Sequence, residues 1–415
     1  MDVRVRSNLV PMLLEPLPRL LALSVLLGAF GHAAHAQNMC QATEHGMRAD
    51  GSDNTAALTK ILVDCAGKTI HIAHGTYTFS PKGFAAGLKV PAGTTLAGDG
   101  AQGPQATVLK IAPEGTFQGL LWIRDVSNVA IRGLRFEGTP YESGCHRGLD
   151  YGHAIYIQSD AKQSEGVDNV VVNDNLFHDF NGMSWVTMSA AEGSPGIGVK
   201  GPITIKNNVF ESDANLKGDC VASRGMDYRM DMISAHGSDL SGHGLVENVH
   251  IESNTFKAGY AKGAISIWSS TKDIDIAHNT ILDTGMRVPW APNTELGRYA
   301  IVIYDSAHER PGLPPDAIRV TDNTIQNPMS CGVYVAVGRN LEITGNRISG
   351  QRDRHDGTLP KGAISLNHAL SVTALRDNEL KDNYIAISSV ASHVNMGTNH
   401  IEVPRAGKAQ RIVPP

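Results

Sequence analysis

The sequence predicts an all-β fold, a parallel β-helix that is closed at its N-terminal end by a capping helix. Three observations predict this fold. A strand-like segment that ends in Asn recurs along the chain, a second kind of strand lies between the copies, and 43 of the 415 residues are Gly while only 6% are aromatic. Repeats that stack bury one continuous core, and this composition suits many tight turns.

The first kind of strand alternates apolar and polar residues and then ends in Asn, as in the segment from Glu247 to Asn254. Alternation with a period of two predicts strands with one buried face. A buried Asn at a turn satisfies backbone groups and bonds to the Asn of the next coil. The repeated positions are Asn175, Asn208, Asn254, Asn279, Asn323, Asn346 and Asn378, with a weaker copy at Asn399.

The spacing of these Asn residues predicts the size of one coil. Successive members are 33, 46, 25, 44, 23, 32 and 21 positions apart. The shortest separations match one turn of a three-sided β-helix, so the excess in the other coils must be loop. We therefore expect Asn208, Asn254, Asn279 and Asn323 to superpose on successive coils. The frames of leucine-rich repeats and of propeller blades are missing, which favours the β-helix.

The N-terminal region resembles a known cap. Residues 50–58 and 70–79 resemble the cap of the pectate-lyase, rhamnogalacturonase and epimerase-like branch of the pectin-lyase-like superfamily, and the resemblance extends over residues 37–415. It implies a right-handed parallel β-helix. The apolar residues after Thr55 are spaced for one face of a helix, which can plug the first open coil. The resemblance does not select a reaction, because the superfamily holds hydrolases, lyases, epimerases and binding proteins.

The ends of the chain predict an exported, single-domain protein. Arg residues precede an apolar run at 20–30, and a small-x-small cleavage site ends at Ala36. We expect residues 1–36 to be a signal peptide and 37–415 to be one β-helix domain with a cap region at 37–80, secreted or periplasmic. No later segment reaches about 18 apolar residues, so no membrane span is expected. A net charge of −5 offers no basic field for nucleic acid, and we expect a monomer.

Five Cys residues in an exported chain permit disulfides. Cys40 and Cys65 bracket the N-terminal segment and are candidates to staple it. Cys145 and Cys220 lie in long loops on one face, so we expect their Cα atoms within about 7 Å of each other. Cys331 then remains in a strand, although sequence alone leaves the connectivity open. No His and Cys spacing indicates a zinc site.

The second kind of strand defines the face on which insertions gather. Long loops precede these strands at about 138–152, 212–230, 284–298 and 349–360, which predicts a groove across the coils. Alternation then places two columns of side chains on this face. The first column is Tyr156, Thr187, Ser234, Ser266, Val302, Tyr334 and Ser365, and the second is Gln158, Ser189, His236, Trp268, Tyr304, Ala336 and Asn367.

A polar and aromatic trio is expected near the middle of this groove. His236, Trp268 and Tyr304 should stack, because adjacent coils lie about 4.8 Å apart. Exposed Trp and Tyr rings suit the apolar faces of sugar rings, although such a stack can also serve the fold alone. The expected substrate-binding residues are Trp268, Tyr304, Tyr156, Arg224 and Arg298.

An acidic loop runs up to the strand that carries His236. Paired carboxylates are what glycoside hydrolysis requires, whereas a lyase needs a base such as His and a cation or Arg beside the uronate carboxylate. The Asp cluster could hold Ca²⁺ for this purpose. The alternative is a solvated acidic loop whose Asp residues pair with its own Arg residues. The candidate catalytic residues are Asp219, Asp227, Asp231, His236 and His243.

Two short motifs resemble part of another active site. Gly218-Asp219-Cys220 and Gly242-His243-Gly244 resemble the Asp-Asp-Cys and Gly-His-Gly motifs of polygalacturonase-type hydrolases. The first Asp of that pair is Gly218 here, and the Asn-Thr-Asp and Arg-Ile-Lys motifs have no counterpart. The Asp-Pro-His signature of alginate C5-epimerases is also missing. His153 begins a strand and is placed to reach the groove, and His278 beside the Asn repeat is expected in a turn.

Three functions remain open at this point. The first is a polysaccharide-cleaving enzyme, either a glycoside hydrolase or a β-eliminating lyase. The second is a uronate C5-epimerase, which shares the proton abstraction of a lyase. The third is a noncatalytic carbohydrate-binding or surface protein. The sequence names neither the glycan nor the bond.

Overall fold

The structure is a computed structural model that divides into two units, Met1–Met39 and Cys40–Pro415, and the fold below is that of the second unit. The residues that it describes are 39–80, 87–112, 119–138, 153–160, 166–179, 184–190, 198–212, 231–237, 244–258, 263–284, 299–304, 313–352, 362–383, 385–389, 391, 393–402 and 411–412.

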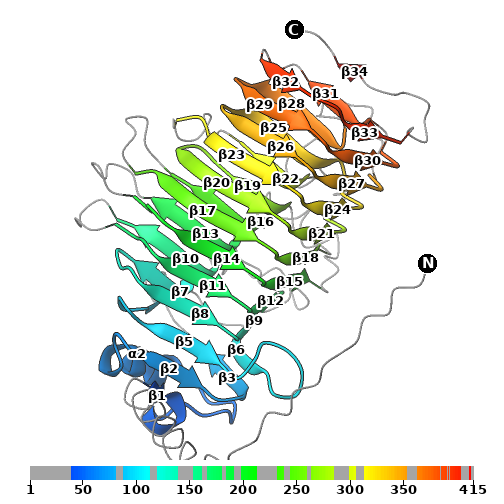
Figure 1. The fold of residues 1–415 in the computed structure, drawn as a ribbon. Helices are drawn as coiled ribbons and strands as arrows, with labels where there is room; N and C mark the ends of the chain where they lie inside the picture. Colours follow the sequence, from blue (N-terminus) through cyan, green and yellow to red (C-terminus); the bar gives the residue numbers. More distant parts are fainter. Residues whose placement is uncertain are drawn as a thin grey trace, which may run out of the picture. The chain divides into compact units, whose positions relative to one another are not determined.

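Three parallel sheets run side by side along the molecule, and successive strands of the chain visit them in turn (Figure 1). Sheet A contains the strands that end just before the repeated Asn, together with four strands that precede the first repeated Asn in the chain. In spatial order they are β1 (Met39–Gln41), β2 (Thr69–Ile72), β5 (Thr95–Gly98), β8 (Val129–Arg132), β11 (Val170–Asn173), β14 (Ile203–Lys206), β17 (Val246–Glu252), β20 (Thr271–Ala277), β23 (Asp316–Thr321), β26 (Leu341–Thr344), β29 (Val372–Arg376) and β32 (Val394–Met396).

Sheet B contains the short strands that follow the repeated Asn, together with three strands that precede the first repeated Asn in the chain. They are β3 (Gly75–Phe79), β6 (Thr107–Ile111), β9 (Arg135–Glu137), β12 (Leu176–His178), β15 (Val209–Ser212), β18 (Thr255–Ala258), β21 (Thr280–Leu282), β24 (Thr324–Gln326), β27 (Arg347–Ser349), β30 (Glu379–Lys381) and β33 (His400–Ile401).

Sheet C contains the second kind of strand. Its strands are β4 (Leu88–Lys89), β7 (Gly119–Arg124), β10 (His153–Ser159), β13 (Ser184–Ala190), β16 (Asp231–His236), β19 (Gly263–Ile267), β22 (Tyr299–Ile303), β25 (Cys331–Gly338), β28 (Ile364–Ala369), β31 (Ile387–Ser389) and β34 (Arg411–Ile412). One strand from each sheet makes one coil, so the predicted right-handed parallel β-helix is confirmed.

The repeated Asn residues form a buried ladder, as the spacing predicts. The side-chain amide of each Asn donates to the side-chain oxygen of the next, from Asn175 to Asn399, over 2.9–3.1 Å. The second amide hydrogen donates to a sheet A carbonyl, such as Ile205 O for Asn254 at 2.8 Å. The residues before Asn175, Asn208, Asn254, Asn279, Asn323, Asn346 and Asn378 have a positive φ. They include His278 at 56°, which confirms it as a turn residue.

The core inside the coils is apolar and regularly stacked. Phe136, Phe177, Phe210 and Phe256 follow the Asn ladder on sheet B, with ring centroids 4.7–4.9 Å apart. These separations equal the spacing of neighbouring strands, so one residue type repeats at one position of successive coils. Isoleucine continues the column at Ile281, Ile325 and Ile348.

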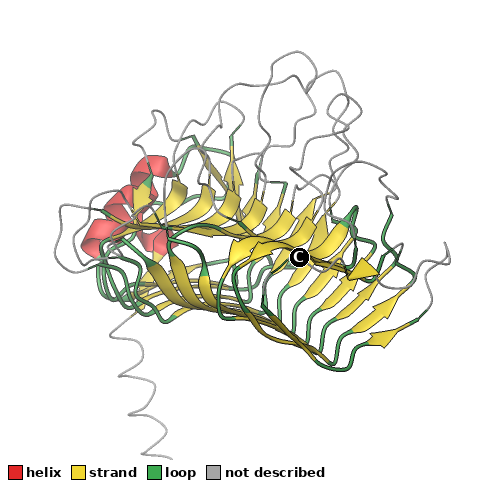
Figure 2. Cartoon of the chain, turned by 90° about the horizontal axis from the view of Figure 1, so that it is seen from above, coloured by secondary structure: helices red, strands yellow, loops and turns green. Residues whose placement is uncertain are grey.

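The N-terminal end carries the predicted capping helix, α2 (Thr55–Asp64), with a short 3-10 helix, η1 (Ala42–His45), before it. Figure 2 shows the helical segments at one end of the stacked strands. Leu58, Ile61 and Leu62 of α2 are buried against the core, which closes the first coil. A disulfide joins Cys40 to Cys65, as the sequence suggests, and Cys331 is a buried thiol on β25. Among the described residues, no helix is long and apolar enough to cross a membrane.

Candidate functional site

The outward face of sheet C carries the two columns that alternation predicts. Residues of the first column are direct neighbours in register, from Tyr156 beside Thr187 to Tyr334 beside Ser365. In the second column Ser189 pairs with His236. The backbone N–H of Trp268 donates to Ala235 O on β16 over 2.8 Å, and that of Tyr304 donates to Ile267 O over the same distance, so these residues continue the column.

Two aromatic side chains lie next to each other in this column. Trp268 and Tyr304 meet edge to face, with ring centroids 5.1 Å apart and ring planes at 77°. Ser189 Oγ lies 3.4 Å from Nδ1 of His236, in the next coil. His236, Trp268 and Tyr304 are all partly exposed. The predicted pair of aromatic rings therefore exists, with an imidazole on the neighbouring strand.

A third column, at the beginning of the strands, also faces outward. The residues that follow its members, such as Ala154, Trp185 and Met232, lie in the core, although strict alternation would place them on the outside. The chain turns a corner there, so two successive residues point inward and the one before them points out. The members of this strand-start column are His153, Ser184, Asp231, Gly263, Tyr299 and Cys331.

His153 is held by a hydrogen-bond network that crosses three coils. Its Nδ1 lies 2.7 Å from the Ser184 carbonyl and 3.0 Å from Oγ1 of Thr187, and that hydroxyl lies 3.2 Å from Ser234 Oγ. A carbonyl only accepts, so Nδ1 carries the proton and donates. Nε2 then has the lone pair, and among the described residues no hydrogen bond reaches it.

Burial is the main cause that lowers the pKa of His153 to about 4. The nearby His236 acts in the same direction, and the hydrogen bond to the Ser184 carbonyl opposes both. The imidazole is therefore neutral at pH 7. A neutral imidazole with one fixed N–H is in the state that can accept a proton.

Asp231 occupies the strand-start column on the strand that ends in His236. A methyl group placed on Gly263 of the next strand would lie 3.2 Å from Asp231 Oδ1 and 3.9 Å from Ser266 Oγ. A side chain on Gly263 would therefore crowd the Asp231 carboxylate, and glycine lets this carboxylate lie close to the neighbouring strand. Ser266 Oγ is buried and accepts or donates no hydrogen bond within the described part of the chain.

Tyr156, expected to bind substrate, lies deeper than Trp268. It is only 6% exposed and stacks between the rings of His153 and Trp122, with centroids 4.8 and 6.2 Å away. Trp122 in turn donates from Nε1 to Gln158 over 3.0 Å. Tyr156 therefore supports the position of His153. The sequence analysis did not single out Trp122, because only the coil contacts identify it as part of this cluster.

Several predicted residues lie outside the described part of the chain. They are Asp219, Asp227, His243, Arg224 and Arg298, together with the cysteines Cys145 and Cys220. Their roles stay predictions, as does Ca²⁺ binding by the acidic loop. From the predicted set, the structure thus brings His236, Trp268 and Tyr304 into one column. Asp231 lies at the other end of β16, five residues before His236, in the strand-start column. The structure adds His153 and Ser266 to this face.

Comparison with known proteins supports the fold. No family model matches the chain, and no curated protein matches its sequence. Among solved structures, ORF18 of Geobacillus virus E2 matches 93% of this chain at 10% identity, with a TM-score of 0.56. The tailspike protein of E. coli bacteriophage HK620, in complex with a pentasaccharide, matches 91% at 11% identity, with a TM-score of 0.57. An alginate lyase from Paenibacillus sp. str. FPU-7 matches 88% at 14% identity, with a TM-score of 0.50.

The chain therefore has the right-handed parallel β-helix fold. It spans less than two thirds of the two viral proteins, 64% and 65% of their lengths, and 99% of the alginate lyase. At identities of 10–14%, these structural matches show a shared fold alone. A shared fold does not define a function, so the function of the outward face of sheet C depends on the residues that it carries.

Proposed function

We propose that this protein binds a polysaccharide along the outward face of sheet C and cleaves it, either by hydrolysis or by β-elimination. The observation that carries the proposal is the column of His236 and the partly exposed pair Trp268 and Tyr304, with His153 and Asp231 in the strand-start column of the same face. Sugar rings stack on aromatic faces, and proton-transfer groups lie within the same few coils. A regular strand spacing of about 4.8 Å suits an extended, repeating ligand.

The roles follow from the chemistry of each group. Asp231 or His236 moves the proton, with the loop residues Asp219, Asp227 and His243 as further candidates. The aromatic pair holds a sugar next to the bond that reacts. Neutral His153 supports the site as a second imidazole close to His236. In a hydrolase two carboxylates act as acid and base or nucleophile, whereas in a lyase an imidazole takes the proton beside a uronate carboxylate.

The similar solved structures support a carbohydrate as the class of ligand. One similar fold is described in complex with a pentasaccharide, and another is an alginate lyase. An exported location is part of the proposal, because an apolar run at 20–30 precedes a small-x-small site and a disulfide joins Cys40 to Cys65. Mass spectrometry of the secreted protein should find an N-terminus at Gln37.

The first experiment is a screen of acidic and neutral polysaccharides. New reducing ends with new ultraviolet absorbance identify a lyase, because elimination creates an unsaturated uronate. New reducing ends without that absorbance identify a hydrolase. Exchange of the C5 hydrogen with solvent, without cleavage, identifies the alternative epimerase.

The second experiment separates catalysis from binding on the substrate found. Asp231→Asn and His236→Ala should each lower turnover by about 10²–10⁴ if that side chain moves the proton. Trp268→Ala should chiefly weaken binding, since stacking is shared by substrate and transition state, and Trp268→Phe should retain most of it. The control is His250→Ala, an outward imidazole on sheet A.

Two outcomes would contradict parts of this proposal. Near-normal turnover in both Asp231→Asn and His236→Ala would place the chemistry elsewhere, with the loop carboxylates as the next candidates. If no glycan is cleaved or epimerised, but one binds and Trp268→Ala abolishes that binding, the protein is a noncatalytic carbohydrate-binding protein.

A further inference from the structure

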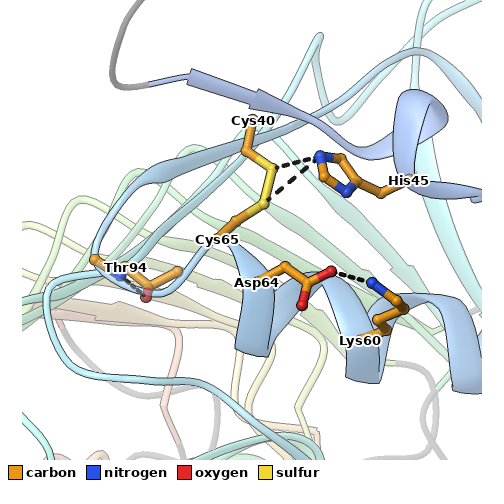
Figure 3. The surroundings of a disulfide bond; sticks show 7 residues. Cys40, His45, Lys60, Asp64, Cys65 and Thr94 are labelled. Carbon is orange, nitrogen blue, oxygen red and sulfur yellow. Dashed lines mark hydrogen bonds and ion pairs between the residues drawn. A yellow bond between two sulfur atoms is a disulfide. The ribbon is translucent and has the colours of Figure 1, made fainter.

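A cluster of three potential metal ligands, Cys40, His45 and Cys65, lies at the N-terminal cap (Figure 3). Nε2 of His45 lies 3.2 Å from Cys40 Sγ and 3.9 Å from Cys65 Sγ. All three ligand atoms lie within 4.8 Å of one another. Among the described residues, the His45 ring makes no other hydrogen bond, so both sulfurs face the same ring nitrogen.

The three residues are positioned by different elements. Cys40 belongs to β1, His45 is the last residue of η1, and Cys65 directly follows α2. Both sulfur-bearing residues are buried, at 6% and 2% exposure, whereas the imidazole is exposed. The folded cap therefore holds two sulfurs below the surface, and the ring forms the side that solvent reaches.

These distances are close to those of a tetrahedral metal site. With Zn–S bonds of about 2.3 Å and a Zn–N bond of about 2.0 Å, a tetrahedral ion separates its S and N ligands by roughly 3.6 Å and its two S ligands by roughly 3.8 Å. The two observed N–S distances, 3.2 and 3.9 Å, lie on either side of that value. Only the sulfurs must move apart, by less than about 2 Å, once the bond between them is broken.

We propose that Cys40, His45 and Cys65 form a redox-gated site for a soft divalent cation, with Zn²⁺ as the preferred ion. A dithiol reductant transfers two electrons and two protons to the disulfide, becomes a disulfide itself, and leaves two thiols. Zn²⁺ then replaces the two thiol protons, which pass to solvent, and bonds to both sulfurs and to the lone pair on Nε2. Water takes the fourth position.

The disulfide and the metal site exclude each other, because each sulfur serves one or the other. The cap is closed by a covalent staple in the oxidised protein and by the ion in the reduced protein. His45 distinguishes this arrangement from a simple staple, which requires no third ligand. The proposal is independent of the function assigned to sheet C.

The test is a zinc titration of the full chain in two redox states. The protein is reduced with a dithiol, freed of reductant under nitrogen, and titrated with Zn²⁺ against a chromophoric chelator. The reduced protein should bind one more equivalent of Zn²⁺ than the oxidised protein and than Cys40→Ser/Cys65→Ser, which corrects for the other thiols. His45→Ala should weaken this binding at least tenfold, His45→Cys should retain it, and His71→Ala is the matched control.

A spectroscopic readout identifies the ligands. Co²⁺ in place of Zn²⁺ should give thiolate-to-metal charge-transfer absorption in the reduced protein, and Cys40→Ser/Cys65→Ser should lack it. No additional zinc in the reduced protein, or equal affinity in His45→Ala, overturns the proposal. If reduction unfolds the cap, zinc must restore the circular dichroism of the oxidised protein in the wild type but not in His45→Ala. Failure of that recovery overturns the proposal as well.

Discussion

The buried side chain of His153 links the stability of the protein to pH. It donates from Nδ1 to the Ser184 carbonyl, stacks on Tyr156 and is almost fully buried. Burial lowers its pKa to about 4, whereas the unfolded chain has a value of about 6.5. Because the unfolded state binds the proton more tightly, His153 contributes its full stabilisation above about pH 6.5, and this is lost as the pH falls toward 4.

The first prediction concerns His153→Gln, which keeps a donor but cannot titrate. Between pH 7 and pH 4 the wild type should lose about 3 kcal/mol more unfolding free energy than the variant, because a shift of roughly 2.5 pKa units corresponds to that energy. Urea unfolding at both pH values measures this difference. His250→Gln, on an outward and partly exposed histidine, is the control. The same pH dependence in wild type and His153→Gln would contradict the prediction.

The Asn ladder joins successive coils of the β-helix through hydrogen bonds. In each coil the Asn side chain accepts from the Asn of the preceding coil and donates to the Asn of the following coil and to a sheet A carbonyl. Asn254, for example, accepts the backbone and side-chain N–H groups of Asn208 over 2.9 and 3.0 Å. All these groups are buried, so each lost bond leaves an unsatisfied polar atom in the core.

The second prediction follows for Asn254→Ala. Truncation removes the partners of Asn208, Asn279 and Ile205 at once, so the free energy of unfolding should fall by roughly 3 kcal/mol or more. Asn395→Ala is the matched control, since that exposed side chain donates a single bond to Thr373 O, and we expect a loss of under about 0.5 kcal/mol. Thermal or urea unfolding followed by circular dichroism gives both values. Equal losses would show that the ladder adds nothing beyond ordinary surface hydrogen bonds.

At the scale of the whole molecule, a coil stack needs closed ends. An open first coil would expose core residues and unpaired strand edges, and α2 covers that end with Leu58, Ile61 and Leu62. The disulfide from Cys40 to Cys65 encloses 25 positions of sequence and ties β1 to the end of α2. A crosslink over a loop of this size restricts the unfolded chain and so favours the folded cap.

The third prediction is that Cys40→Ser/Cys65→Ser lowers the free energy of unfolding by about 3 kcal/mol, the value expected from the loop that the bond closes. The loss should appear first as faster hydrogen exchange in β1 and α2. Strands β17 and β20 in the middle of the stack serve as the internal control, because the ladder there is untouched. Unchanged exchange in the cap would contradict a stapling role.

The fourth prediction concerns the segments that precede two strands of sheet C in the sequence. Cys145 and Cys220 precede β10 and β16, which are separated in the sheet by β13 alone. Two strand spacings amount to about 10 Å, a gap that two long loops can close. Peptide mapping without reduction should recover a Cys145–Cys220 pair from the secreted protein. Two thiols at these positions in the oxidised protein would refute the pairing.

The sequence by itself determined the fold, the ladder and much of the outward face. Period-two alternation, and a buried polar residue that needs hydrogen-bond partners in every coil, are local requirements. Both can therefore be recognised in the sequence alone. They predicted that Asn208 lies beside Asn254 and that Ser234 lies beside Ser266. The aromatic neighbours Trp268 and Tyr304 followed from the same register.

Only the tertiary structure decided where the strand-start column faces and what meets at the cap. His153 and Asp231 point outward because the chain turns a corner just after them, and the one sequence trace of that corner is a pair of adjacent apolar residues, as at Ala154 and Ile155. His45 meets two sulfurs because η1 and α2 pack at the same end of the first coil. The spacing of residues along the chain predicts contacts that repeat in every coil. Contacts made at a bend or between two packed helices depend on the relative orientation of the elements, which sequence periodicity does not predict.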